Sequence, residues 1–295
     1  MSENIFDYGD ITNTEKIIRS TWADFRELLG KGIFKYNELE VAKKAIFLKQ
    51  FDDYFNKNNC KRFFTKTIGD LINQQYIFAR GAKLKENEIA DYNRFIPIST
   101  YISKDNRFSP EGIEWLYLAY GFNGNKDDRI EAAEACTVSE CRAEQGQKFG
   151  ICRFVLDAIF ENVKLVDLTI ADDLTYTQLN TNLEKYGKKV KKNMRRISDI
   201  GIQPHINQNE FKKKFEEWFS YTDAKLISEQ LFEPVTNGTE KYMYAPFQCL
   251  AKYFESLGYG GILYPSTVYP QARNIVLFNK TIGHPSGAIK TFIIQ

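Results

Sequence analysis

From Gln75 onward, short β-leaning runs and helix-like stretches follow one another without a regular alternation. The β-leaning runs are rich in β-branched and aromatic residues and lie at 76–80, 115–119, 149–156, 163–168, 261–264, 274–278 and 289–294. The helix-like stretches lie at 129–143, 176–198, 210–221 and 246–257. Because the strands neither alternate strictly with helices nor segregate from them, the pattern predicts an α+β fold with a mixed or antiparallel sheet.

The first 74 residues have the hydrophobic spacing of helices and not that of strands. Ile18, Trp22 and Phe25 recur at helical spacing, and a second amphipathic stretch covers 39–55. We therefore predict a helical N-terminal extension over 1–74 and one main domain over 75–295. Within that domain, residues 170–242 are predicted as a helical insert between the 163–168 strand and the 261–264 strand.

The charge balance argues against some classes of partner. The chain has 40 basic and 38 acidic residues, a net charge of +2, which does not favour a chain-wide surface for nucleic acid or anionic membranes. No apolar window is long enough to span a membrane, and the N-terminus is acidic where a signal peptide would be basic. We expect a cytoplasmic protein without a membrane partner. The basic run at 184–196 is interpreted as a solvated helix face, with binding of nucleic acid or an acidic partner as the alternative.

Histidine and cysteine are scarce, with two and five residues and no CxxC pair. We therefore expect neither a metal site nor a disulfide framework. The chain also lacks GxxxxGK[ST], HExxH and GxSxG, and no GxGxxG follows a strand. These absences argue against P-loop ATPases, zinc proteases, serine hydrolases and Rossmann dehydrogenases. The 23 Phe, 17 Tyr and 3 Trp can supply a large core and the wall of a pocket.

Four segments stand out when they are read together, at 76–82, 106–119, 132–169 and 257–278. They include Arg80 before a glycine, and the sequences R-F-S-P-E-G (107–112), L-Y-L-A (116–119), T-V-S-E-C-R (137–142) and G-Y-G-G-I-L-Y-P-S (258–266). At these residues the chain resembles the RES-domain family, which is named for an Arg, a Glu and a Ser in that order. The resemblance covers about 75–278, and its specificity lies in the shared order of the motifs.

This resemblance implies an ADP-ribosyltransferase-like fold and cleavage of the N-glycosidic bond between nicotinamide and ribose in NAD⁺. The acceptor in such proteins is water, inorganic phosphate or a protein. Many are bacterial toxins that a partner antitoxin with an Xre-like helix-turn-helix module neutralises. We therefore expect an NAD⁺ glycohydrolase or phosphorylase that acts as a toxin or defence effector, with ADP-ribosylation of a protein target as the alternative.

The matched positions suggest a role for each residue. Glu140, Arg80 and Tyr117 are the predicted catalytic residues, and Glu140 would stabilise the oxocarbenium-like charge left by departing nicotinamide. Arg80 and Arg107 would bind the pyrophosphate of NAD⁺, which guanidinium recognises bidentately. Tyr117 would stack on the nicotinamide or its ribose, and Ser266 would hydrogen-bond that ribose or hold Glu140. NAD⁺ is the substrate, and neither a metal nor another cofactor is required.

The sequence departs from the family pattern at two places, and more than one glutamate lies near the position of the predicted catalytic residue. Gly260 replaces the acidic residue usual in the late motif, and residues 121–127 read as an inserted loop. Three other carboxylates, Glu131, Glu134 and Glu144, lie close enough in sequence to compete with the predicted catalytic glutamate.

Overall fold

A computed structural model describes the chain except for residues 1–10, 34, 36, 58–59, 200–207 and 232–239. Within the described part, eight strands form one sheet in the order β1-β5-β6-β7-β3-β2-β4-β8. The strands are β1 (Thr65–Thr67), β2 (Ile77–Lys83), β3 (Leu116–Gly121), β4 (Lys148–Leu156), β5 (Lys164–Asp167), β6 (Gly261–Pro265), β7 (Arg273–Leu277) and β8 (Gly283–Ile293). Strands β5 and β6 are parallel and the other neighbouring pairs are antiparallel. The prediction of an α+β fold with a mixed sheet is confirmed.

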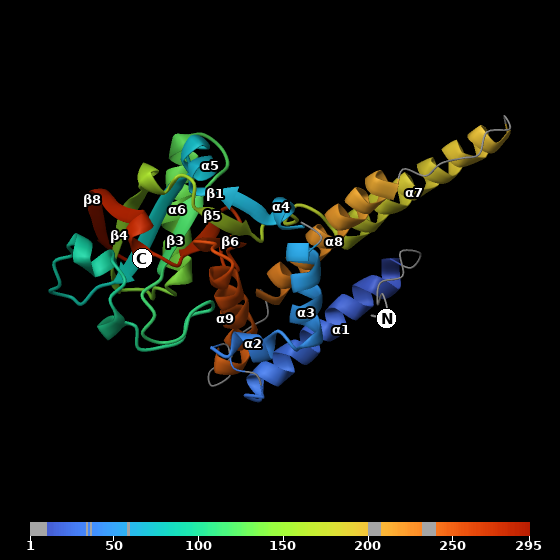
Figure 1. The fold of residues 1–295 in the computed structure, drawn as a ribbon. Helices are drawn as coiled ribbons and strands as arrows, with labels where there is room; N and C mark the ends of the chain where they lie inside the picture. The colour runs from blue at the N-terminus through green and yellow to red at the C-terminus, as the bar shows by residue number, and fades with distance from the viewer. Residues whose placement is uncertain (1–10, 34, 36, 58–59, 200–207, 232–239) are drawn as a thin grey trace.

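The helices gather into two groups (Figure 1). Helix α6 covers β2 and β3, whereas α1 packs on α3, α8 and α9 to form a helical lobe beside the sheet. The helices are α1 (Ile11–Gly30), α2 (Leu39–Ala42), α3 (Ile46–Asp52), α4 (Lys61–Phe64), α5 (Ile68–Asn73), α6 (Lys126–Glu140), α7 (Tyr176–Asp199), α8 (Gln208–Leu231) and α9 (Glu240–Ser256).

The central strands are buried on both faces. In β6, Ile262 belongs to the core shared with the helical lobe, whereas Leu263 belongs to a second core on the opposite face. In β7, Val276 and Ile275 divide in the same way. Successive side chains of a strand point to opposite faces, so a strand covered on both sides needs an unbroken apolar run. This is why 261–264 and 274–278 were recognisable as strands.

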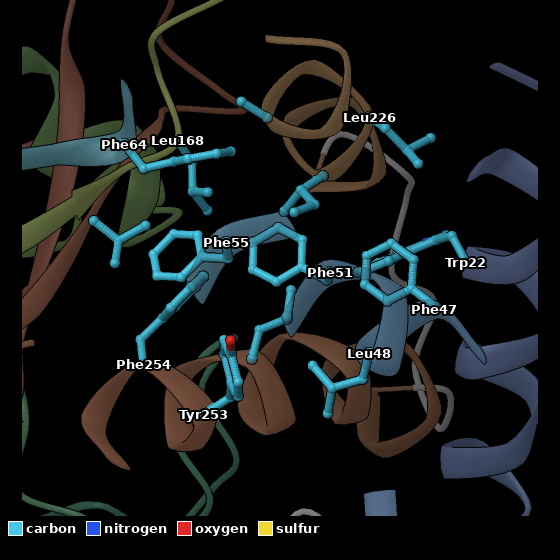
Figure 2. Packing of buried hydrophobic residues seen from close by; sticks show 14 of the residues in the cluster. Trp22, Phe47, Leu48, Phe51, Phe55, Phe64, Leu168, Leu226, Tyr253 and Phe254 are labelled. Atoms are coloured by element: carbon cyan, nitrogen blue, oxygen red, sulfur yellow. The ribbon is translucent and has the colours of Figure 1, made fainter. Parts of the chain in front are cut away.

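An aromatic cluster joins the N-terminal segment to α9 (Figure 2). Phe51 of α3 lies edge-on to Tyr253 and Phe254, with ring centroids 6.0 and 5.9 Å apart. Trp22 of α1 meets Phe47 of α3 edge-on at 5.0 Å. Large aromatic side chains bury more area than other residues, so this cluster uses part of the aromatic surplus to hold the extension on the rest of the chain.

Strand β1 was not predicted, and it lies within the segment predicted as an extension. Thr65 pairs with Val166 of β5, so the sheet begins before residue 74. A three-residue Thr-Lys-Thr strand has no apolar alternation to mark it. At its end, the Thr67 hydroxyl accepts a hydrogen bond from the Asp70 amide at 3.1 Å, and the Asp70 carboxylate accepts one from the Thr67 amide at 2.8 Å. This capping box begins α5 directly after the strand.

Two predicted helices differ from the observed ones. The stretch predicted at 39–55 is divided, because Ala45 is extended (φ −61°, ψ 137°) between α2 and α3. The helix predicted from Pro246 begins at Glu240 instead and contains that proline in its interior. Proline removes one backbone donor from a helix. Burial of Phe247, Leu250 and the aromatic residues that follow them keeps α9 continuous through Pro246.

Helices α7 and α8 come from the predicted insert and pack side by side as a two-helix arm that projects from the body (Figure 1). The base of the arm is apolar, with Leu179 and Trp218 buried. Among the described residues, no helix is long and apolar enough to cross a membrane. All five cysteines are free thiols.

Asp223 of α8 is a carboxyl group inside the core. Its side chain is 2% exposed, and its Oδ1 has no hydrogen-bond partner among the described residues. Burial raises the pKa of Asp223 well above its ordinary value, so the folded protein holds this proton to a higher pH than the unfolded chain does. The unfolded chain ionises it above about pH 4. The free energy of unfolding should therefore fall as the pH rises above about 4, by up to about 1.4 kcal/mol per pH unit, until the folded-state pKa is reached.

Replacing Asp223 with asparagine removes this ionisation. We expect the free energy of unfolding of the variant, relative to that of the wild type, to increase as the pH rises from 4 to 7. Urea denaturation at both pH values measures the difference. Asp24→Asn, at an exposed position of α1, is the matched control and should leave the pH dependence unchanged. A difference between Asp223→Asn and wild type that is equal at pH 4 and pH 7 would contradict the prediction.

Candidate active-site cleft

A cleft of about 1480 Å³ lies between the sheet and the helical lobe. Its walls come from β2, β3, the C-terminal end of α6, the residues around the end of β6, the C-terminal end of α1 and the N-terminal half of α9. Four of the five residues predicted from the sequence line it, namely Arg80, Arg107, Tyr117 and Glu140. Residues distant in sequence thus meet at one concave surface, as expected of a ligand site.

Glu140 is the last residue of α6, and one side of its carboxylate is held in place. Its Oε1 accepts a hydrogen bond from the Ser266 hydroxyl at 2.8 Å and another from the Asn274 side-chain amide at 2.6 Å. Two donors on one oxygen restrict rotation of the carboxylate. The side chain itself is exposed and lines the cleft, so it can meet a ligand.

The two donors to Glu140 are buried and supported in turn. Ser266 is 2% exposed, and its Oγ accepts a hydrogen bond from the Tyr269 amide at 3.0 Å. Asn274 is 5% exposed, and its Oδ1 accepts a weak hydrogen bond from the Cys136 thiol at 3.8 Å. Ser266 therefore acts here as a residue that positions Glu140, which is one of the two roles predicted for it.

The other carboxylates considered from the sequence do not line the cleft. Glu134 forms an ion pair with Lys290 of β8 at 2.6 Å, and Glu131 is exposed elsewhere on α6. Glu144 lies beyond the helix, where its amide donates to the Gln147 side chain. Geometry thus separates Glu140 from its three neighbours.

Arg80 of β2 lines the cleft and contains one unpartnered donor. Its Nη1 is buried and has no hydrogen-bond partner among the described residues. Burial lowers the pKa of the Arg80 guanidinium to about 10, so the group still carries its charge at neutral pH. A buried donor without a partner costs free energy, and an anionic oxygen bound in the cleft would satisfy it.

Tyr117 and Arg107 are held by protein contacts. The Tyr117 hydroxyl lies 2.9 Å from the Ser109 hydroxyl, and burial raises the pKa of this tyrosine. Its ring is thereby fixed as part of the cleft wall. Arg107 donates from Nη1 to the carbonyl of Leu231 at the end of α8, and its guanidinium lies 5.8 Å from the centre of the Tyr244 ring. Arg107 therefore ties the loop before β3 to the helical lobe, and only its remaining donors are open to a ligand.

Asn274 lies within the strand predicted at 274–278, but its residue type alone predicts no role in the site. The available signal was an amide at the start of an otherwise apolar run, Asn-Ile-Val-Leu-Phe. Buried polar side chains normally have hydrogen-bond partners, so such a residue points to a polar neighbour across the fold. Which neighbour it meets is decided by the packing of α6 on the sheet.

The glycine that departs from the family pattern has a packing explanation. A Cβ added at Gly260 would lie 2.3 Å from Cγ1 of Val163, just before β5. An acidic side chain at this position would require Val163 to move, and Gly260 is not among the residues that line the cleft. The departure therefore concerns strand packing at a distance from Glu140.

Among the described residues, no group of three or more His, Cys, Asp or Glu side chains is arranged to hold a metal ion. Comparison of the chain with family models, curated proteins and solved structures gave no match.

Proposed function

We propose that the protein cleaves the bond between nicotinamide and ribose of NAD⁺ in the cleft around Glu140. The observation that carries the proposal is the Glu140 carboxylate itself, fixed on one oxygen by Ser266 and Asn274 and exposed to a cleft that Arg80 also lines. We include in this proposal an ADP-ribosyltransferase-like fold, which the observed α+β architecture is compatible with.

Glu140 would supply electrostatic stabilisation. Nicotinamide in NAD⁺ is cationic and leaves as a neutral molecule, so no acid is needed to protonate it. Departure transfers positive charge to the ribose, whose transition state resembles an oxocarbenium ion. A carboxylate whose orientation is already set by two hydrogen bonds stabilises that charge without having to reorganise during the reaction.

Arg80 and Tyr117 would bind and orient the dinucleotide. The Arg80 guanidinium, which lines the cleft, would donate to a phosphate oxygen, and a charge-assisted hydrogen bond of this kind contributes about 1.5–3 kcal/mol. The ring of Tyr117, fixed through Ser109, offers an apolar face on which nicotinamide or its ribose can stack. Together they would place the scissile bond beside Glu140.

The size of the cleft bears on the acceptor. Ligand pockets usually have volumes of about 300–1,000 Å³, and this cleft reaches about 1480 Å³. The remaining space would admit an acceptor beside NAD⁺, whether water, inorganic phosphate or a side chain of a target protein. Depletion of NAD⁺ would arrest growth, which is the basis for proposing a toxin or defence effector with an Xre-like antitoxin as its partner.

The direct test is to incubate purified protein with NAD⁺, with and without phosphate, and to separate the products by chromatography. We expect release of nicotinamide, unaffected by a chelator, with ADP-ribose or its phosphorylated form as the second product. Labelled NAD⁺ in the presence of a cell extract tests transfer to a protein, which is the alternative. The absence of nicotinamide release under all of these conditions would contradict the proposal.

A second candidate function, binding of nucleic acid, is favoured by how charge is distributed. Residues 184–214 contain ten Lys and Arg against three Asp and Glu, a net charge of +7, whereas the whole chain carries +2. The remainder of the chain is therefore net negative, at −5. All ten of these cations are exposed on the α7–α8 arm, which projects from the body. Ion pairs join Lys188 to Glu184 at 3.8 Å and Lys214 to Glu217 at 2.8 Å.

If the arm binds nucleic acid, affinity should fall steeply with salt, because each neutralised phosphate releases counterions. Reversing four lysines of α7 (Lys188, Lys189, Lys191 and Lys192) to Glu should abolish binding of a labelled duplex, whereas Glu140→Gln should not affect it. Reversal of four exposed lysines outside the arm (Lys16, Lys61, Lys126 and Lys164) is the matched control. Equal loss of binding in both variants would show that net charge alone, and not the arm, is responsible.

A further inference from the structure

Among the described residues, Gln75 and Arg142 are the only two residues other than glycine with a left-handed backbone, with φ of 55° and 46°. Arg142 follows α6 in a Schellman turn, in which its amide donates to Ser139 at 3.0 Å and the amide of Ala143 donates to Val138 at 3.3 Å. The same two bonds close the turn after α5, where the Gln75 amide donates to Ile72 at 2.9 Å and the Tyr76 amide donates to Leu71 at 3.3 Å. Glycine is the residue favoured at this position because a Cβ makes the left-handed conformation costly.

The two strained residues differ in their surroundings. Arg142 lies two residues after Glu140, is exposed, and lines the cleft. No hydrogen bond or ion pair joins its guanidinium to another residue of the described chain. Gln75 does not line the cleft, and its main contact is through its backbone carbonyl, which accepts a hydrogen bond from Arg129 at 3.1 Å. Strain at a non-glycine residue beside a candidate site points to a function for the side chain.

The left-handed turn determines where the guanidinium can act. It ends α6 directly after Glu140, so residues 140 and 142 lie on the same wall of the cleft with Cα atoms at most about 7 Å apart. A carboxylate and a free guanidinium at this separation can contact neighbouring parts of one ligand. Arg107, which also lines the cleft, already donates from its Nη1 to the Leu231 carbonyl.

We propose that Arg142 is a substrate-positioning residue that binds the pyrophosphate of the dinucleotide while Glu140 faces the adjoining ribose. This inference rests on the proposed function and deepens it. A guanidinium matches the geometry of phosphate oxygens bidentately, whereas glycine at the same position would satisfy the backbone but offer no ligand. Arginine at this position therefore carries a backbone strain that glycine would avoid, but it supplies a guanidinium that can contact the substrate.

Three variants of Arg142 separate charge from strain. Arg142→Gln removes the charge but keeps the Cβ, so the KM for NAD⁺ should rise about tenfold to a hundredfold while Tm stays unchanged. Arg142→Gly should raise KM equally and also raise Tm by about 2 to 4 °C, because the strain is relieved. Arg142→Lys should recover part of the affinity. In all three variants, kcat should stay within a few-fold of wild type. The lost contact binds the bound substrate and the transition state equally, and Glu140 is unchanged.

Gln75→Gly is the matched control, since it relieves the same backbone strain in the same kind of turn away from the cleft. It should raise Tm by an amount similar to that of Arg142→Gly and leave KM unchanged. A rise in KM in this control would mean that relaxing a helix end disturbs the cleft generally, and the role of Arg142 would be overturned.

Binding of ADP-ribose, measured by calorimetry, distinguishes failure of this inference from failure of the proposed function. If wild type releases nicotinamide and Arg142→Gln has wild-type KM and wild-type affinity for ADP-ribose, the inference is overturned and the proposed function stands. If wild type binds ADP-ribose without releasing nicotinamide from NAD⁺, the proposed function fails, and weaker binding by Arg142→Gln still supports the inference. A wild-type protein that does not bind ADP-ribose overturns the inference.

Discussion

Glu140→Gln should lower the rate of nicotinamide release at least about a hundredfold, which corresponds to about 3 kcal/mol of lost transition-state stabilisation. Glutamine has nearly the same shape as glutamate, and its side-chain oxygen can still accept the hydrogen bonds from Ser266 and Asn274. The substitution therefore removes the negative charge while keeping the local geometry. Single-turnover kinetics with saturating NAD⁺ measure the effect on the chemical step.

Glu131→Gln is the matched control for this experiment. Glu131 lies on the same helix, is exposed, and does not line the cleft, so the same chemical change should leave the rate within about twofold of wild type. Tm should be similar for both variants and the wild type. An active Glu140→Gln protein would rule out Glu140 as the group that stabilises the developing charge, even if wild type cleaves NAD⁺.

The largest effect on stability is expected from Phe51→Ala, which should lower the free energy of unfolding by about 3–5 kcal/mol. Phe51 is 3% exposed and lies at the centre of the aromatic cluster, where its ring meets Phe55 at 5.3 Å and Phe64 at 6.0 Å (Figure 2). Its removal leaves a cavity between α3 and α9 that the surrounding rings cannot close. Urea denaturation of variant and wild type measures the difference.

The control for this prediction is Ile46→Ala in the same helix. Ile46 is 56% exposed, so its truncation should change the free energy of unfolding by no more than about 0.5 kcal/mol. A loss below about 1 kcal/mol for Phe51→Ala would mean that the N-terminal helices contribute little to the fold. The cleft depends on this packing, because it is lined both by the end of α1 and by α9.

The residues of the candidate active site come from different elements of the fold, whereas the cations of the α7–α8 arm come mostly from one helix. Arg80, Tyr117 and Glu140 belong to β2, β3 and α6, and only the folded chain brings them together. The cations of α7, in contrast, follow one another in sequence and would be adjacent in any helix. Co-localisation of distant residues is therefore the stronger reason to look for function at the cleft first.

The secondary structure was predictable where burial leaves a long pattern in the sequence. The runs at 261–264 and 274–278 are strands because both faces of the sheet are covered, and α7 spans 176–199, close to the predicted 176–198. Strand β1 left no such pattern, since three residues paired at a sheet edge need no apolar alternation. The start of α9 was mistaken because proline is common at the first turn of a helix, while tertiary burial here keeps it in the interior.

The candidate site was predictable only as a set of residue types. The order of the motifs suggested Arg80, Glu140 and Ser266 and left two roles open for Ser266, of which the structure shows the contact with Glu140. It did not suggest that Asn274 would donate to the same oxygen. Arg107 was predicted from its place in the R-F-S-P-E-G motif, whereas its contact with Leu231 depends on where α8 ends. Such contacts join residues more than a hundred positions apart, and no local pattern encodes them.

By itself, the sequence determined the order of strand-like and helix-like segments and hence the α+β class, most of the strands, and the concentration of positive charge between 184 and 214. Only the tertiary structure decided that Glu140, among four nearby carboxylates, lines the cleft, and that Arg142 enters it through a left-handed turn. The physical reason is that the hydrophobic periodicity of a segment shows which face of that helix or strand is buried, whereas a site depends on which elements pack against one another. That choice is settled by packing across the whole chain.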